Sequence, residues 1–139
     1  MTSELRAVID TNVLVSAALL PRSVPRQAID LTLGRGVLLL SESTVFELDD
    51  VLRRPKFDNY VSPRSRLEFL SAVVNQAEIV PILQTVTECR DADDNKFLEL
   101  AVCGKASHIV SGDADLLAMH PFRGISVIRA DEFVALWKE

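Results

Sequence analysis

Aromatic, cysteine and histidine residues are scarce in this chain, and each scarcity excludes a class of protein. Phe, Trp and Tyr make up 6% of the residues, so the core must be mainly aliphatic, and few rings are available to stack on the bases of single-stranded nucleic acid. The two cysteines and two histidines do not form a set with the spacing of a zinc site or a redox pair. We therefore expect two reduced thiols, as in cytoplasmic proteins, and histidines with structural roles.

Long hydrophobic runs and an excess of positive charge are also absent. The apolar segment at 13–20 is too short to span a bilayer. Asp10 and Asn12, just before it, are polar residues that the hydrophobic core of a signal peptide would not contain. A formal net charge of −5 argues against a protein that coats DNA nonspecifically, because phosphate binding draws on Lys and Arg. The sequence therefore predicts a cytoplasmic protein with no membrane association.

The order of apolar segments predicts the fold class. The 139 residues are 48% hydrophobic, which indicates a single domain over 1–139 with a substantial core. Short aliphatic segments typical of buried strands lie at 5–9, 37–40, 77–81, 107–110 and 125–128. Amphipathic segments with helix caps lie between them, within 26–36, 41–54, from 63, 91–104, 114–119 and 130–139. This alternation predicts an α/β fold with a mainly parallel central sheet flanked by helices, in three α/β/α layers.

Four carboxylates from separate segments are expected to meet at one edge of this sheet. Asp10 ends the first predicted strand, and Asp113 follows the strand at 107–110. Asp94 lies in the first turn of the helix that leads into that strand, and Glu47 lies on the helix after the second strand. In open α/β sheets, ligands bind outside the carboxyl ends of the strands, which is where these acids are predicted to gather.

Such a gathering of acids indicates a divalent cation. Neighbouring carboxylates raise one another's pKa and oppose the compact state, and a bound cation removes that penalty. Mg²⁺ and Mn²⁺ prefer oxygen ligands, and they neutralise the charge that develops on phosphate oxygens. Other phosphate chemistries fit poorly, because Asn12 stands where an aspartyl-phosphate phosphatase has a second aspartate and no glycine-rich phosphate loop is present.

Each acid also has a purely structural explanation. Asp10 and Asp113 could cap the helices that they precede, and the acids at 91–94 could cap a helix or complement its dipole. Glu47 could be a solvated charge on a helix surface. Capping does not explain acids at the ends of two different strands, so the set as a whole favours a site.

With these residues in view, the chain resembles the PIN domain family of metal-dependent nucleases, and within it the branch of toxins from toxin–antitoxin systems. Four segments carry the resemblance, in family order and over nearly the whole chain: VIDTNVLVSA (8–17), STVFELDDVLRRPKF (43–57), CRDADDNKFLELAV (89–102) and HIVSGDADLL (108–117). DTNV alone is moderately specific, and the four together are strongly so. Serine at 111 replaces the usual threonine before the final Gly-Asp and keeps its hydroxyl.

The resemblance implies a ribonuclease that uses Mg²⁺ or Mn²⁺ and leaves 5′-phosphate and 3′-hydroxyl ends. By position it assigns the catalytic and metal-binding roles to Asp10, Glu47, Asp94 and Asp113. It assigns supporting roles to Asn12, Ser111, Asp91 and Asp115. It further implies an RNA substrate, an antitoxin protein as partner, and a homodimer or higher homo-oligomer.

Basic residues outnumber acids between positions 22 and 66, although the whole chain is acidic. The candidates to guide RNA phosphates are Arg22, Arg26, Arg53, Arg54 and Lys56. Any one of them could equally be a solvated residue at a helix end or in a loop. The alternative function is a catalytically weak PIN-fold module that binds RNA or a protein, and the intact set of four acids favours the enzyme.

Overall fold

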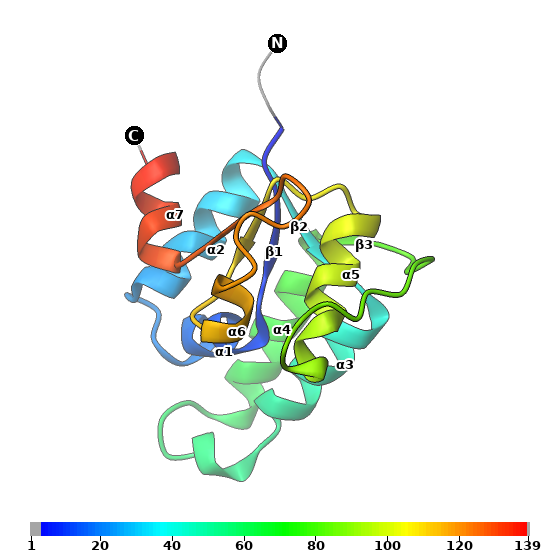
Figure 1. Ribbon diagram of the computed structural model, residues 1–139. Coiled ribbons are helices and arrows are strands. Elements are labelled where there is room, and N and C mark those ends of the chain that lie inside the picture. The colour runs from blue at the N-terminus through cyan, green and yellow to red at the C-terminus, as the bar shows by residue number, and fades with distance from the viewer. Residues whose placement is uncertain (1–3, 139) are drawn as a thin grey trace.

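The computed structural model describes residues 4–138, which form a five-stranded parallel sheet with helices on both faces (Figure 1). The strands, in the spatial order β3-β2-β1-β4-β5, are β1 (Arg6–Ile9), β2 (Val37–Leu40), β3 (Glu78–Ile79), β4 (His108–Val110) and β5 (Ser126–Ile128). The α-helices are α1 (Thr11–Leu19), α2 (Val24–Arg35), α3 (Glu42–Leu52), α4 (Pro63–Gln76), α5 (Asn95–Cys103), α6 (Ala114–Leu117) and α7 (Ala130–Trp137).

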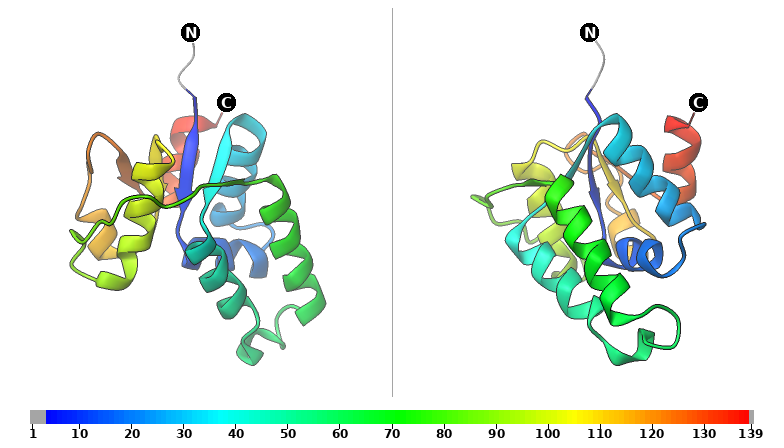
Figure 2. Two further views of the ribbon diagram at one scale, coloured as in Figure 1. Left: turned by 90° about the vertical axis from the view of Figure 1, so that its right-hand side faces the viewer. Right: turned by 180° about the vertical axis from the view of Figure 1, so that it is seen from behind.

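Side chains alternate between two separate cores along the central strand β1. Ile9 packs with α1, α2, α3, α4 and α7 on one face of the sheet, whereas Val8 packs with α5 and α6 on the other. Figure 2 shows this division, with α5 and α6 on one side of the strands and α2 and α4 on the other. Both clusters are mainly aliphatic, and the structure confirms the predicted three-layer α/β/α architecture.

Local sequence signals set most of the element ends. Ser41 and Ser62 accept hydrogen bonds from backbone N–H groups in the first turns of α3 and α4, and Pro63 begins α4 as the sequence predicts. Gly36 is required at the start of β2, because a Cβ atom there would lie 2.2 Å from the carbonyl oxygen of Leu5. Of the helices within residues 4–138, none has the length and apolarity needed to cross a membrane.

The segment predicted as one helix from residue 91 differs from that prediction. Residues 92–94 form a short 3₁₀ helix, η2 (Ala92–Asp94), and the regular helix α5 begins only at Asn95. The Asp91 side chain accepts a hydrogen bond from the backbone N–H of Asp93, which favours this tighter turn. A second 3₁₀ helix, η1 (Pro55–Phe57), follows α3.

Helix α7 packs against the first residue of β4. Its Trp137 packs edge-on against His108, the first residue of that strand, with the ring centroids 5.7 Å apart. His108 also makes an edge contact with Phe133, and the Nδ1 atom of His120 lies 3.0 Å from the backbone nitrogen of Val127. Both histidines thus take part in packing or backbone contacts, and neither lines the acidic pocket described below.

Arg66 is a buried cation that its sequence context does not reveal. Its side chain is 1% exposed, and its guanidinium donates hydrogen bonds to the carbonyl oxygens of Leu52 and Val61 and to Asp58. The donor–acceptor distances are 2.7, 2.6 and 2.7 Å respectively. Arg66 therefore ties the first turn of α4 to the end of α3 and to the loop that connects them.

The Arg66→Met variant is expected to lower the free energy of unfolding by about 3 kcal/mol, because it removes three charge-assisted hydrogen bonds and leaves the buried carbonyl group of Leu52 and the half-buried one of Val61 without this donor. Urea denaturation measures this change. Arg64→Met is the matched control, because the Arg64 side chain is 90% exposed on the same helix and should change stability little. Equal stability of the two variants would contradict the role given to Arg66.

Candidate metal centre

Asp10 is held in place by two hydrogen bonds at the end of β1. It is 4% exposed, and its Oδ1 atom accepts a hydrogen bond of 2.9 Å from the backbone N–H of Val13, which makes it the N-cap of α1. Its Oδ2 atom accepts a hydrogen bond from the hydroxyl of Ser111. Burial raises the pKa of Asp10, and these hydrogen bonds act in the opposite direction. The capping explanation for Asp10 is therefore correct, and it is compatible with a place in the site.

Asp91, Asp94 and Asp113 form a tight acidic cluster. One oxygen atom from each carboxylate lies within 4.8 Å of the others. The Oδ2 atom of Asp94 is buried and has no hydrogen-bond partner in the described part of the chain. Burial, together with the negative charges of Asp113 and Asp91, raises the pKa of Asp94 to about 7.

This cluster fits a hard divalent cation. Its donors are carboxylate oxygens only, they converge within reach of one ion, and the unpartnered oxygen of Asp94 lacks the interaction that a buried carboxylate requires. Asp91, Asp94 and Asp113 are the residues that could hold such an ion. Asp10 lies beside them without belonging to the cluster, and its charge contributes to the raised pKa of Asp94.

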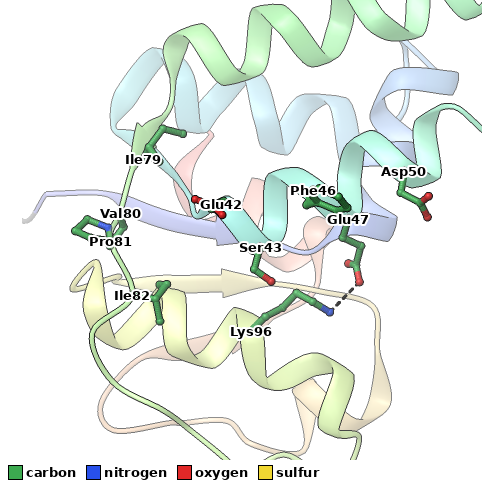
Figure 3. A pocket seen from close by; sticks show the side chains of 10 residues that line it. All are labelled: Glu42, Ser43, Phe46, Glu47, Asp50, Ile79, Val80, Pro81, Ile82 and Lys96. Atoms are coloured by element: carbon green, nitrogen blue, oxygen red, sulfur yellow. Dashed lines mark hydrogen bonds and ion pairs between the residues drawn. The ribbon is translucent and has the colours of Figure 1, made fainter.

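Glu47 is held separately from the cluster, by residues of two other helices. Its Oε1 atom accepts a hydrogen bond from the hydroxyl of Thr11 on α1, and its Oε2 atom lies 2.8 Å from the ammonium of Lys96 on α5. Figure 3 shows the Lys96 side chain reaching from α5 to Glu47 on α3. Burial opposes ionisation of Glu47, but the hydrogen bonds from Lys96 and Thr11 outweigh it and hold the pKa of Glu47 below its usual range.

One small pocket brings the predicted acids together. It has a volume of about 270 Å³, and its lining includes Asp10, Glu47, Asp94 and Asp113. The structure also places Asn12 and Asp91 in the lining, whereas Asp115 is not among the lining residues. Ser111 is fully buried and contacts the pocket only through Asp10 and the backbone of Asp113. The pocket lies at the carboxyl ends of β1 and β4, as expected for a ligand site in a parallel sheet.

Among the five basic candidates for RNA binding, the structure brings only Arg54 to this pocket. Arg54 also makes an ion pair of 3.4 Å with Asp50. The candidates that do not line the pocket are Arg22, Arg26, Arg53 and Lys56. Arg26 pairs with Asp30, one turn along α2, and Arg53, directly after α3, pairs with Asp49 in the last turn of that helix. The Lys56 ammonium lies over the ring of the adjacent Phe57.

Sequence reasoning missed two residues of this region, Thr11 and Lys96. Thr11 lies within the DTNV motif, and Lys96 follows Asp94 by two positions, so proximity to a motif was the available signal.

A larger hollow of about 920 Å³ also includes Glu47 and Lys96 and extends along α3 to residues 79–82 (Figure 3). Its lining is largely apolar and includes Phe46, which is 76% exposed.

The Ser111→Ala variant is expected to weaken Mn²⁺ binding about tenfold to a hundredfold, the usual effect of losing a residue that orients a metal-binding carboxylate. The Ser111 hydroxyl donates to Asp10 and accepts a hydrogen bond of 2.9 Å from the backbone N–H of Asp113, so its loss disturbs two acids at once. Calorimetric titration with Mn²⁺ measures the change. Ser111→Thr keeps the hydroxyl and should bind Mn²⁺ nearly as the unmodified chain does; equal loss in both variants would show that the hydroxyl is not what matters.

Comparisons with known proteins show similarity in sequence and in fold. A family model of the PIN domain matches residues 6–115. The chain is 33% identical over 118 residues to an uncharacterized protein of Methanocaldococcus jannaschii, and the alignment covers 84% of this chain and 76% of that protein. Two solved structures have the same fold at low sequence identity. VapBC2 from Rickettsia felis, bound to a DNA fragment from their promoter, superposes with a TM-score of 0.62 at 13% identity, over 88% of this chain and 97% of that one.

The second solved structure is PAE2754 from Pyrobaculum aerophilum, with a TM-score of 0.62 at 16% identity over 97% of this chain and 91% of that one. The fold and the acidic pocket at its sheet edge define a PIN-type α/β protein. Because the family model matches most of the sequence, the chain belongs to the PIN domain family. The family resemblance carried by the four sequence segments is thus confirmed.

Proposed function

We propose that this protein is a Mg²⁺- or Mn²⁺-dependent endoribonuclease of the cytoplasm and the toxin of a toxin–antitoxin pair. The observation that carries the proposal is the cluster of Asp91, Asp94 and Asp113, with the unpartnered buried oxygen of Asp94, in the pocket of a PIN domain. Five acids line this pocket of about 270 Å³, and a carboxylate-held cation suits the charged oxygens of a phosphate group.

The residues of the pocket would have different roles in phosphodiester hydrolysis. Asp91, Asp94 and Asp113 would hold the cation, with Asp10 beside them, and Asn12 at the pocket wall would orient the substrate or water. When bound, the cation would supply charge neutralisation at the phosphate oxygens and a lowered pKa for water. Glu47 would accept a hydrogen bond from the attacking water, and Arg54 would contact a neighbouring phosphate. The water oxygen would bond to phosphorus as the P–O3′ bond breaks, with one water proton passing to O3′ and the other to solvent, which leaves a 3′-hydroxyl on one fragment and a 5′-phosphate on the other.

An antitoxin protein is the proposed partner. The fold is shared with VapBC2 of Rickettsia felis, and the sequence resembles the toxin branch of the family, which supports this assignment. A homodimer or higher homo-oligomer is proposed on the same resemblance. Growth arrest on expression of the chain, relieved by co-expression of a protein encoded beside it, is the expected result in cells.

Cleavage of defined RNA tests the proposed activity directly. Purified protein is incubated with a structured RNA and with DNA of the same sequence, in Mn²⁺, in Mg²⁺ and in EDTA. RNA fragments with 5′-phosphate ends are expected only with metal, and ligation to an adaptor identifies those ends. Cleavage that persists in EDTA would refute the metal-dependent mechanism. If protein with bound metal cleaves no RNA, the chain is the RNA- or protein-binding module named above as the alternative.

A further inference from the structure

We propose that Lys96 is a positioning residue that, together with Thr11, fixes the Glu47 carboxylate at the wall of the pocket, outside the ligand set of the cation. The inference rests on the proposed ribonuclease function and assigns different tasks to its acids. Asp91, Asp94 and Asp113 bind the cation, whereas Glu47 serves as an oriented hydrogen-bond acceptor. Lys96 affects the reaction only through Glu47.

Both oxygens of Glu47 are already engaged by residues from opposite sides. Thr11 donates to Oε1 from the first position of α1, and Lys96 donates to Oε2 from α5, 49 positions away in sequence. Thr11 is 5% exposed, so its hydroxyl has little freedom to leave this contact. Two donors from two helices fix both the position of the carboxylate and the rotation of its plane.

Lys96 is itself held in place, which distinguishes it from a mobile surface lysine. Its side chain is 20% exposed, and its ammonium also donates a hydrogen bond to the carbonyl oxygen of Asp93. The same ammonium lies 5.4 Å from the ring centroid of Phe97, a buried residue that lines the acidic pocket. The contacts with Asp93 and Phe97 already restrict the Lys96 side chain, so the ion pair with Glu47 costs little additional side-chain entropy.

Glu47 is also separate from the acids that suit the cation. The carboxylates whose oxygens converge within 4.8 Å are those of Asp91, Asp94 and Asp113, and Glu47 is not in that group. A lysine that contacts a carboxylate lowers the availability of that carboxylate to a cation, because the two positive charges compete for the same oxygens. On one side of the pocket, the negative charges of Asp91, Asp94 and Asp113 can attract a cation. On the other side, the charge of Glu47 is already neutralised by its ion pair with Lys96.

The test uses Lys96→Met, Glu47→Gln and the double variant, all in the full chain. Lys96→Met is expected to raise Mn²⁺ affinity about threefold to tenfold in calorimetric titration, because an unpaired Glu47 then adds its charge to the site. The same variant is expected to lower the single-turnover rate of RNA cleavage about tenfold or more, because Glu47 loses its fixed position. General structural damage would lower both the Mn²⁺ affinity and the rate, so a rise in affinity together with a fall in rate distinguishes the proposed role from damage.

The double variant determines whether Lys96 acts through Glu47. Lys96→Met combined with Glu47→Gln should cleave RNA no more slowly than Glu47→Gln alone, and its Mn²⁺ affinity should return to that of the unmodified chain within about twofold. Lys96→Arg retains a charged donor and should recover part of the lost rate. Lys138→Met, at an exposed lysine beyond α7, is the control and should match the unmodified chain in both measurements.

Three results would overturn the inference. Additive losses of rate in the double variant would show that Lys96 acts independently of Glu47. A loss of Mn²⁺ affinity in Glu47→Gln as large as in Asp94→Asn would place Glu47 among the cation ligands. Unchanged affinity and rate in Lys96→Met would remove Lys96 from the site. If the unmodified chain cleaves no RNA, the proposed function fails, and the affinity measurements alone still decide how Lys96 and Glu47 interact.

Discussion

Asp94→Asn is expected to lower the rate of metal-dependent RNA cleavage by at least about a hundredfold, the usual scale for loss of one charged group that acts on the transition state. Asp94 lies in the three-acid cluster, and its Oδ2 atom is buried and unpartnered among the described residues. Asparagine offers one neutral oxygen in place of a carboxylate and binds a hard cation poorly. Single-turnover cleavage with saturating Mn²⁺ measures the effect.

The position of Asp94 makes this substitution a specific probe. Its side chain makes no capping hydrogen bond to α5, so the variant should fold as the unmodified chain does. Asp10→Asn would also lose activity, but the buried side chain of Asp10 caps α1, so a loss of stability would accompany that change. Asp93→Asn is the matched control, since it removes the same charge from an exposed neighbour outside the cluster. Cleavage by Asp94→Asn at the rate of the control would remove Asp94 from the proposed mechanism.

Without metal, the protein is expected to lose stability as the pH rises, and Asp94 is the cause. The pKa of Asp94 is about 7 in the folded chain and near its ordinary value of 3.8 when the chain is unfolded. Between these two values the folded state binds more protons than the unfolded state, so the free energy of unfolding falls as the pH rises from about 4 to about 7 and remains lowered above that. Urea denaturation in EDTA at a series of pH values measures this dependence.

The comparison with Asp94→Asn isolates this contribution from those of other acids. The variant cannot ionise at this position, so its stability relative to the unmodified chain should rise as the pH increases from about 4 to about 7 and should stay constant above that. Mn²⁺ at a hundred times its dissociation constant should then stabilise the unmodified chain by about 2.7 kcal/mol at pH 8, and should stabilise the variant much less. A constant difference in stability between the two proteins from pH 4 to pH 8 would contradict the raised pKa.

The fold was predictable because its signals are local and mutually consistent. The aliphatic run Val37–Leu40 became a strand with the predicted bounds, the segment at 107–110 became the strand His108–Val110, and Ser62 with Pro63 set the start of α4. Arg66 shows the limit of such reasoning. Arginine is rarely buried, and only the three-dimensional path of the loop at 53–62 provides the acceptors that allow it here.

The candidate site was predictable to the extent that topology determines it. Parallel strands end at one edge, which brings Asp10 and Asp113 together whatever the details of packing. The place of Asp91 in the acidic cluster depends on η2, because residues three apart eclipse in a 3₁₀ turn and Asp91 thus comes to the same side as Asp94. The contact between Lys96 and Glu47 joins two of the family segments, 43–57 and 89–102, but neither segment indicates which residue of the other it contacts.

Because Trp137 packs against His108, its fluorescence can report on the folded state of the protein. It is the single tryptophan of the chain, and it lies at the start of β4, whereas the acidic pocket lies at the end of that strand. Its fluorescence should therefore follow the docking of α7 and global unfolding, and should change little when a divalent cation enters the pocket. Quenching by paramagnetic Mn²⁺ would be weak for the same reason, so stability and metal occupancy can be followed in one sample without interfering with each other.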